Sequence, residues 1–442
     1  MSMKPGSLNS RMGSRHGSAS VPTTLASLDV GTTKICCVIA DALPSKHKGL
    51  TDAQPALKIL GFGQTASRGV KAGSIINVDE AERAIRQAVD AAERMAERHI
   101  NAVHVNVSGG RPLSQVTRGS VQTLGGVVSP RDADNAVSNA IAQVDVGQRQ
   151  VLHLMPVAFS LDGVESPAVP MGLHGSTLTT DMGVVTVDPA ALRNLSLTVE
   201  RCHLSVSGFA VSPYAAARGA LAADERALGT IVIDMGGGTT SVAIFRQGKL
   251  ASAFVIPVGG MQVTADVAQG LSTTLAHAER MKTMFGAVWP AGYEDREMLA
   301  VPLVGERGVD TVQKLPKSAL CAIIKPRIEE IFDLVIQRLN EQPQLAAMAG
   351  RVVLTGGASQ LPGLRDHAQL MFGRQVRLGQ PQPQAGMPEM ARSSGFAAAF
   401  GLLNLAAQPD KLYAMPQAAQ AAIDRSQLTY AQRVGRWLKE AI

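Results

Sequence analysis

Short apolar runs alternate with segments of helical period through most of the chain. Residues 231–233 and 242–245 are strand-like apolar runs, whereas residues 264–285 have the period of a single helix. Strands that alternate with helices along a chain are typical of layered α/β proteins. The pattern therefore predicts an α/β fold.

The two ends of the chain depart from this pattern. Residues 1–22 are rich in Gly and Ser and have no apolar period, which predicts a disordered tail. Residues 406–427 contain Pro409 and Pro416 among many Ala and Gln, and they predict a linker of moderate flexibility. We therefore expect the folded body to lie between the two ends.

Residues 428–442 predict a basic amphipathic helix that binds a membrane surface. Four apolar side chains share the i, i+3, i+4, i+7 spacing of one helical face: Val434, Trp437, Leu438 and Ala441. Basic side chains flank this face: Arg433, Arg436 and Lys439. Such a helix lies in the headgroup region of an anionic membrane, with Trp at the interface. The alternative is a helix that docks back on the body.

Length and charge narrow the classes of function. A chain of 442 residues with 45% apolar content exceeds the size of about 250–300 residues at which single cores stop growing, so we expect two or more domains. Of the net charge of +6, residues 1–22 carry +3 and residues 432–442 carry +2. The nearly neutral body has only 4 Tyr and 2 Trp, so we expect no nucleic-acid binding.

Cysteine spacing and hydropathy point to the cytosol. The 4 cysteines are irregularly spaced and form no CxxC or zinc pattern, which predicts reduced thiols. No apolar run approaches the roughly 20 residues that cross a bilayer, and the polar N-terminus lacks the apolar core of a secretory signal.

An internal repeat is the most informative feature. In the first copy, an apolar strand ends at Asp29, a turn of Gly31, Thr32 and Thr33 follows, and Lys34 opens a second apolar strand. In the second copy, Asp234 ends the strand, and the turn has five residues: Gly236, Gly237, Gly238, Thr239 and Thr240. Each copy predicts a β-hairpin with an anion-binding tip. Two such halves predict a pseudo-symmetric bilobal protein with a cleft between the lobes.

The turn residues suit a nucleoside triphosphate and its metal. Glycine has no Cβ and tolerates positive φ, so backbone N–H groups approach phosphate oxygens closely, and Thr hydroxyls add donors. Lys34 adds a positive charge. Asp29 and Asp234 suit Mg²⁺ held through water, because Mg²⁺ keeps several of its waters. For one copy alone, an ordinary glycine turn would be the simpler explanation.

A third glycine turn follows a strand near residue 354. Gly356, Gly357 and Ala358 form this turn, and a predicted helix begins a few residues later. By itself it fits an ordinary strand–helix loop. Beside the repeat, we expect it to contact the nucleoside.

These motifs resemble the phosphate and adenosine signatures of the actin, Hsp70 and sugar-kinase ATPase superfamily, with connecting helices at residues 207–217 and 394–401. Within it, residues 25–405 resemble the FtsA family of bacterial cell-division proteins. The resemblance implies an actin-like bilobal ATPase fold with an inserted subdomain, termed 1C, that opens with a strand in residues 99–110. Glu279 and Lys282, three residues apart, then resemble the ribose and adenine contacts, although a surface salt bridge is the alternative.

The resemblance also implies an order of segments along the chain: 1–22 tail; 23–96 subdomain 1A; 97–175 subdomain 1C; 176–228 return to 1A; 229–270 subdomain 2A; 271–345 subdomain 2B; 346–405 return to 2A with the second connecting helix; 406–427 linker; 428–442 amphipathic helix.

Resemblance to this family implies a role in cell division at the septum. The expected partners are the C-terminal tail of FtsZ, further copies of the chain in an actin-like protofilament, anionic lipids of the inner membrane and other divisome proteins. The protein would then be peripheral to the cytoplasmic face of that membrane. Lys325 and Arg327 fall in the helix that matches the FtsZ contact; a solvated basic corner is the alternative.

Hydrolysis of ATP is less firmly implied than its binding. Some actin-fold hydrolases orient water with Glu or Gln near the first connecting helix, but Val211, Ser212 and Pro213 supply neither, so no catalytic residue is assigned and at most weak ATPase activity is expected. The alternatives are a pilus-assembly scaffold of the actin type and a small-molecule kinase of the same superfamily. A kinase would need a general base that the sequence does not show.

Overall fold

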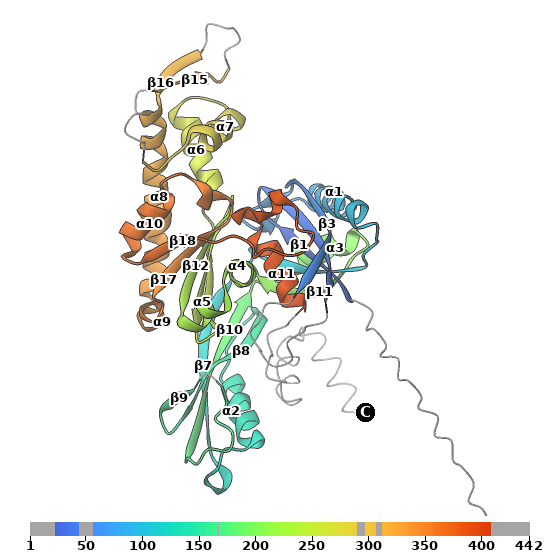
Figure 1. The fold of residues 1–442 in the computed structure, drawn as a ribbon, viewed down its shortest axis with the longest axis vertical. Coiled ribbons are helices and arrows are strands. Elements are labelled where there is room, and N and C mark those ends of the chain that lie inside the picture. Colours follow the sequence, from blue (N-terminus) through green and yellow to red (C-terminus); the bar gives the residue numbers. More distant parts are fainter. Residues whose placement is uncertain (1–22, 44–55, 167, 290–296, 306–311, 408–442) are drawn as a thin grey trace, which may run out of the picture.

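The structure is a computed structural model that describes residues 23–43, 56–166, 168–289, 297–305 and 312–407 (Figure 1). The predicted tail, the linker beyond residue 407 and the predicted C-terminal amphipathic helix lie outside this part of the chain. Two lobes lie side by side, with one domain below them and a group of helices above (Figure 1).

The first lobe is built on a sheet with strand order β11-β6-β1-β2-β3. Its strands are β1 (Thr23–Val30), β2 (Lys34–Ala42), β3 (Leu57–Ala66), β6 (Ala102–Val107) and β11 (Ser205–Val211). β2 and β3 pair antiparallel, and β6 and β11 pair parallel, on opposite sides of β1. α1 (Val78–Ala96) and α3 (Pro189–Arg201) share its core.

The second lobe repeats this topology with strand order β14-β13-β12-β17-β18. Its strands are β12 (Thr230–Met235), β13 (Thr240–Arg246), β14 (Lys249–Ile256), β17 (Arg351–Thr355) and β18 (Gln375–Leu378). Two antiparallel strands again lie on one side of the central strand, and two parallel strands lie on the other. The internal repeat therefore extends from the sequence motif to the whole sheet.

Two helices connect the lobes by crossing between them. α4 (Ser212–Ala220) follows the first sheet but shares a core with β12, β13 and β17 of the second, whereas α11 (Ala397–Ala407) follows the second sheet and packs on β2 and β3 of the first. A Cβ at Gly401 would overlap the carbonyl oxygen of Ala215, and one at Gly219 would overlap that of Ala397. The small residues therefore permit the close crossing that the sequence predicts.

The inserted domain below the lobes is a second type of sheet, ordered β7-β10-β8-β9 and covered by α2 (Pro130–Ala142) (Figure 1). Its strands are β7 (Leu113–Gln122), β8 (Gln150–Leu161), β9 (Val164–Ser166) and β10 (Thr177–Val187). The expected limits of 97–175 are wrong at both ends. β6 does not open this domain, because it pairs in parallel with β1 and β11, and β10 lies beyond residue 175 yet pairs with β7 and β8.

Above the second sheet, α6 (Gly260–Gly270), α7 (Leu275–Phe285) and α8 (Lys317–Asn340) share one core with that sheet.

The prediction of a single helix at residues 264–285 is wrong, because the helix is interrupted between α6 and α7. Ser272 takes a positive φ of 49°, and the Thr274 side chain accepts the His277 N–H to cap α7. Apolar periodicity continues across this break, so it does not reveal the change of direction.

The remaining elements are short: β4 (Val70–Lys71), β5 (Ser74–Ile75), η1 (Leu124–Gly126), α5 (Ala223–Leu228), β15 (Met298–Pro302), β16 (Val312–Pro316), α9 (Pro343–Met348), η3 (Gly357–Gln360), α10 (Leu364–Phe372), η4 (Glu389–Arg392) and η5 (Ser394–Phe396). All 4 cysteines lie in the described residues, and none of them forms a disulfide. Among the helices described, none has the length and apolar character needed to span a membrane.

Candidate functional site

The two turns of the repeat have the same local structure. In the β1–β2 turn the Gly31 N–H donates to the Lys34 carbonyl at 3.0 Å, and in the β12–β13 turn the Gly236 N–H donates to the Thr239 carbonyl at 2.8 Å. Each turn thus closes a hairpin directly after the strand that carries Asp29 or Asp234. The predicted pair of hairpins is present.

The tips of these hairpins meet across the boundary between the lobes. A Cβ at Gly238 would lie 2.6 Å from Thr32 Oγ1, and one at Gly237 would overlap the Thr33 methyl group. None of the glycines at 31 and 236–238 has a positive φ. These positions therefore require glycine for close approach rather than for a positive φ.

Asp29 is buried and Asp234 is partly buried, each near the end of the strand that leads into its tip. Burial raises the pKa of Asp29 to about 6, although Lys34 lowers it in part. Burial and the nearby Asp29 carboxylate raise the pKa of Asp234 to about 7. Burial disfavours the charged form of both carboxyl groups, and the charge of Asp29 further disfavours that of Asp234. A bound divalent cation would offset both the burial and the repulsion between the charges.

Lys34 reaches from the first lobe to the start of the second connecting helix. Its Nζ lies 3.3 Å from the centroid of the Phe396 ring, a cation–π contact. Burial lowers the pKa of Lys34, while the Asp29 and Asp234 carboxylates oppose that change. The Lys34 ammonium therefore lies near both aspartates, with one face against the Phe396 ring.

The third turn joins this site through Asp234. Gly356 has a positive φ of 86°, and a Cβ there would overlap Oδ1 of Asp234. The Gly356 N–H donates to the Ser394 carbonyl at 3.2 Å, just before α11. At this one turn, glycine is required both for its backbone conformation and for close approach.

Glu279 and Lys282 lie together on α7, as their spacing predicts, and they form an ion pair of 2.7 Å. Lys282 also donates to Thr264 Oγ1 at 2.8 Å and to the Gly260 carbonyl at 3.1 Å. The ion pair is therefore anchored to α6. Thr264 was not predicted from the sequence, because a threonine within a helical pattern carries no local signal of its tertiary partners.

A cavity of about 470 Å³ brings most of these groups together. Six of the predicted residues line it: Thr33, Gly237, Glu279, Lys282, Gly357 and Ala358. Apolar walls come from Met261, Val263, Ile328 and Leu361. The cavity is thus lined by residues of the glycine turns together with apolar and charged side chains, a combination that is typical of ligand sites.

Asn106 links the first hairpin to the first connecting helix. Its Oδ1 accepts the Val30 N–H at 2.7 Å, and its Nδ2 donates to Ser212 Oγ at 3.0 Å. Asn106 is buried, and Ser212 opens α4. Where some actin-fold hydrolases have Glu or Gln, Ser212 forms hydrogen bonds with Asn106 and Ser108. Asn106 was not predicted from the sequence, because it lies in a strand that was assigned to another domain.

Lys325 and Arg327 lie on α8, and both form ion pairs with carboxylates of the same chain. Arg327 pairs with Asp266 and Glu330, whereas Lys325 lies 3.8 Å from Glu329 and 3.6 Å above the Trp289 ring. Trp289 is 44% exposed. An acidic ligand would therefore compete with carboxylates of this chain, and it would meet an aromatic side chain that the sequence did not single out.

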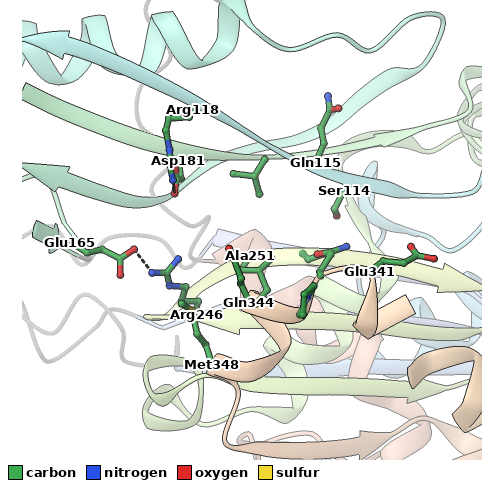
Figure 2. Close-up of a pocket in the computed structure, with 15 residues that line it drawn as sticks. Ser114, Gln115, Arg118, Glu165, Asp181, Arg246, Ala251, Glu341, Gln344 and Met348 are labelled. Carbon is green, nitrogen blue, oxygen red and sulfur yellow. Dashed lines mark hydrogen bonds and ion pairs between the residues drawn. The ribbon is translucent and has the colours of Figure 1, made fainter. Parts of the chain in front are cut away.

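A larger cavity of about 710 Å³ lies between the inserted domain and the second lobe (Figure 2). Its two arginines are paired, Arg118 with Asp181 at 2.7 Å and Arg246 with Glu165. Ser114 Oγ bridges the two parts at one side, within 2.7 Å of both the N–H and the carbonyl of Ala253. This cavity contains none of the predicted phosphate or nucleoside residues.

Two family models match the chain. The model described as "Cell division protein FtsA" matches residues 231–401, and the one described as "SHS2 domain inserted in FTSA" matches residues 109–186. The second range begins after β6 and ends in β10, in agreement with the limits of the inserted sheet.

Solved structures of actin-like proteins share the fold. A PilM–PilN type IV pilus biogenesis complex matches with a TM-score of 0.59 at 15% identity, over 87% of this chain and 98% of that one. MreB5 of Spiroplasma citri bound to ADP matches with a TM-score of 0.52 at 14% identity, over 86% and 95% of the two chains. These likenesses show the actin-like fold.

Curated relatives match over nearly the full length. Cell division protein FtsA of Agrobacterium fabrum is 38% identical over 94% of both chains. FtsA of Neisseria meningitidis is 32% identical over 94% of this chain and 97% of its own, and FtsA of Escherichia coli is 31% identical over 85% and 89%. The chain therefore belongs to the FtsA family of actin-like cell-division proteins.

Proposed function

We propose that the chain is an ATP-binding, actin-like division protein that tethers FtsZ filaments to the cytoplasmic face of the inner membrane at the septum. One observation supports nucleotide binding above all. Two equivalent glycine–threonine tips contact each other beside a cavity that is also lined by Glu279, Lys282 and the third turn. Opposed turns of this kind present backbone N–H groups and hydroxyls to phosphate oxygens from two sides.

In this proposal the triphosphate lies between the tips. Thr32, Thr33 and Lys34 contact it from the first lobe, and residues 236–240 contact it from the second. Asp29, which is buried, and Asp234, which is partly buried, hold Mg²⁺ through water molecules where their strands lead into the tips. The nucleoside lies toward Glu279, Lys282 and the turn of residues 356–358. The fold likeness to MreB5, which was solved bound to ADP and bound to AMPPNP, supports this assignment.

Membrane attachment is assigned to the basic amphipathic segment of residues 428–442. Its three cations contribute about 1 kcal/mol each near an anionic leaflet, and partial burial of Val434, Trp437 and Leu438 adds about 3–5 kcal/mol before the cost of ordering the helix. One copy then binds weakly. Several copies on an actin-like protofilament bind together with far higher avidity, so self-association and membrane attachment reinforce each other.

Recruitment of FtsZ is assigned to the surface of α8 that carries Lys325 and Arg327. An acidic C-terminal tail would exchange the carboxylates of Glu329, Asp266 and Glu330 for its own. The exposed ring of Trp289 beside Lys325 offers an apolar contact to the same tail. Other divisome proteins are expected to bind elsewhere. Because the chain is a member of the FtsA family, a division role is favoured over a pilus scaffold or a kinase.

Sedimentation with anionic liposomes tests the tether. The full chain and a chain that ends before Arg433 are compared with and without Mg-ATP. We expect the full chain to pellet, and to pellet more with ATP, whereas the truncated chain stays in the supernatant. Equal pelleting of the two chains would contradict the membrane assignment, and an effect of truncation that ignores ATP would contradict nucleotide-promoted assembly.

Binding of an FtsZ tail peptide tests the partner assignment. We expect K325A and R327A each to weaken binding about tenfold, because each removes a cation from the docking surface. Lys58→Ala is the matched control, since Lys58 is exposed on β3 of the other lobe. Unchanged affinity in both α8 variants would move the FtsZ contact to another surface.

A further inference from the structure

The described part of the chain begins and ends at one edge of the first lobe. β1 opens at Thr23, and α11, which packs against β1, ends at Ala407 (Figure 1). Leu25, near the start of β1, and Ala407 both pack on the apolar cluster to which β2, β3 and α11 contribute. Ala42, the partner of Thr23 on β2, packs on the same cluster. The segments before residue 23 and after residue 407 therefore leave the body from neighbouring points, which we call the exit edge.

The exit edge lies at the opposite end of both elements from the glycine–threonine turns. β1 runs from Thr23 to Val30, which directly precedes the first turn. α11 begins directly after Phe396, whose ring lies 3.3 Å from Lys34 Nζ. A surface that holds the two segments at the exit edge is therefore on the side of β1 and α11 that faces away from these turns.

The two segments that leave this edge carry most of the net charge of +6. Residues 1–22 contain Lys4, Arg11 and Arg15 without Asp or Glu, which gives +3, and residues 432–442 carry +2. The C-terminal segment combines its charge with an apolar helical face, whereas the N-terminal segment has no apolar period and no aromatic side chain. The N-terminal segment is therefore suited to electrostatic attraction alone.

We propose that residues 1–22 are a second membrane contact, which binds anionic lipid by charge alone beside the amphipathic helix of residues 428–442. This inference rests on the proposed membrane tether. A flexible segment rich in Gly and Ser has a root-mean-square span of about 5–6 Å times the square root of its residue count, which puts the three cations about 15–25 Å from Thr23. The linker of residues 408–427 has nearly the same length, so both segments reach one membrane plane. Once the helix is bound, the second contact is intramolecular and strengthens attachment without further apolar burial.

Anionic lipid fits the N-terminal segment better than other acidic partners do. The proposed site for an acidic peptide is on α8, which belongs to the second lobe and lies apart from β1 (Figure 1). Proteins that bind single-stranded nucleic acid stack its bases on aromatic side chains, and residues 1–22 have none. An anionic leaflet requires only positive charge that comes within a Debye length of its surface.

The test measures binding of the full chain, in Mg-ATP, to sedimented vesicles of equal parts phosphatidylglycerol and phosphatidylcholine. Each cation near such a leaflet increases partitioning about fivefold. We expect the triple variant K4Q/R11Q/R15Q to bind about tenfold more weakly in about 0.1 M salt, where the Debye length is about 10 Å. The difference should vanish in about 1 M salt, where the Debye length is about 3 Å, and on vesicles of phosphatidylcholine alone.

The matched control is R131Q/R193Q/K314Q. It also removes one lysine and two arginines, and these three side chains are exposed on α2, α3 and β16 of the body. We expect it to bind the anionic vesicles within about twofold of the unaltered chain, because charges farther than a Debye length from the leaflet are screened.

Two outcomes would overturn the inference. One is a K4Q/R11Q/R15Q chain that binds the anionic vesicles as tightly as the control variant does. The other is a K4Q/R11Q/R15Q chain that loses affinity for an acidic FtsZ tail peptide and keeps its affinity for the vesicles. An unaltered chain that binds no anionic vesicles would instead refute the proposed tether.

Discussion

His153 Nε2 accepts a hydrogen bond from the backbone N–H of Val211 at 2.9 Å. His153 lies on β8 of the inserted domain, and Val211 is the last residue before the first connecting helix, α4. The His153 ring also lies edge-on to Tyr214, with 5.5 Å between ring centroids. The inserted domain is therefore bound directly to the segment that joins the two lobes.

This contact predicts a pH-dependent contribution to stability. Burial lowers the pKa of His153 from 6.5 to about 4, so the fold favours the neutral ring. The contribution is fully present above pH 6.5 and is lost as the pH falls toward 4, because the unfolded chain then binds a proton that the folded chain excludes. We expect His153→Leu to cost about 1–3 kcal/mol at pH 7.5, through the unpaired N–H of Val211.

Denaturant unfolding at several pH values checks this prediction. The loss of stability between pH 6.5 and pH 4 should be smaller in the H153L chain than in the unaltered chain. His277→Leu serves as the control, since the ring of His277 is exposed. Identical pH profiles for the H153L and unaltered chains would exclude the buried neutral state.

Gly237→Ala should weaken nucleotide binding. A Cβ at position 237 would overlap the Thr33 methyl group, so the two phosphate tips must separate. We expect ATP affinity to fall at least about tenfold while the melting temperature changes little, because the clash lies at the surface where the lobes meet. Gly350→Ala is the matched control: no atom lies within 4 Å of its added Cβ. A G237A chain with unaltered affinity would place the phosphates elsewhere.

Asp234→Asn should stabilise the nucleotide-free chain at alkaline pH. The raised pKa of about 7 means that folding favours the protonated carboxyl, and this contribution is lost as the pH rises through 7. A tenfold change in an acid dissociation constant corresponds to about 1.4 kcal/mol, so we expect D234N to gain on the order of 2 kcal/mol at pH 8, and less at pH 5. The same variant should lose Mg²⁺-dependent ATP binding.

Thermal unfolding at pH 5 and pH 8, with Asp134→Asn as the exposed control, measures the gain. An equal effect of D234N at both pH values would argue against the buried acid. Retained Mg²⁺ dependence would argue against the metal assignment of Asp234.

Gly401→Ala should destabilise the fold, although the exchange of glycine for alanine within a helix ordinarily stabilises it by about 1 kcal/mol. The new methyl group would overlap the Ala215 carbonyl of α4, so the two connecting helices must move apart, at a cost of about 1–3 kcal/mol or more. Gly270→Ala provides the comparison, because its Cβ would meet the movable end of the Ile323 side chain. Chemical denaturation should rank G401A well below G270A.

The α/β class, the two glycine–threonine hairpins and the third glycine turn could be predicted from the sequence alone. These features are local, since a strand that ends in Asp and a turn of Gly and Thr lie close together along the chain. Their repetition also indicated two equivalent lobes. Glu279 and Lys282 were found together for the same reason, because three residues along a helix place two side chains on one face.

The pairing of distant segments is visible in the three-dimensional structure alone. The family resemblance placed the strand of residues 99–110 in the inserted domain, whereas β6 pairs in parallel with β1 and β11 of the first sheet. Thr264 and Asn106 acquire their roles from contacts with other elements, and Arg327 acquires Asp266 as a partner in the same way. Apolar periodicity specifies which face of an element is buried, but it does not specify what that face is buried against.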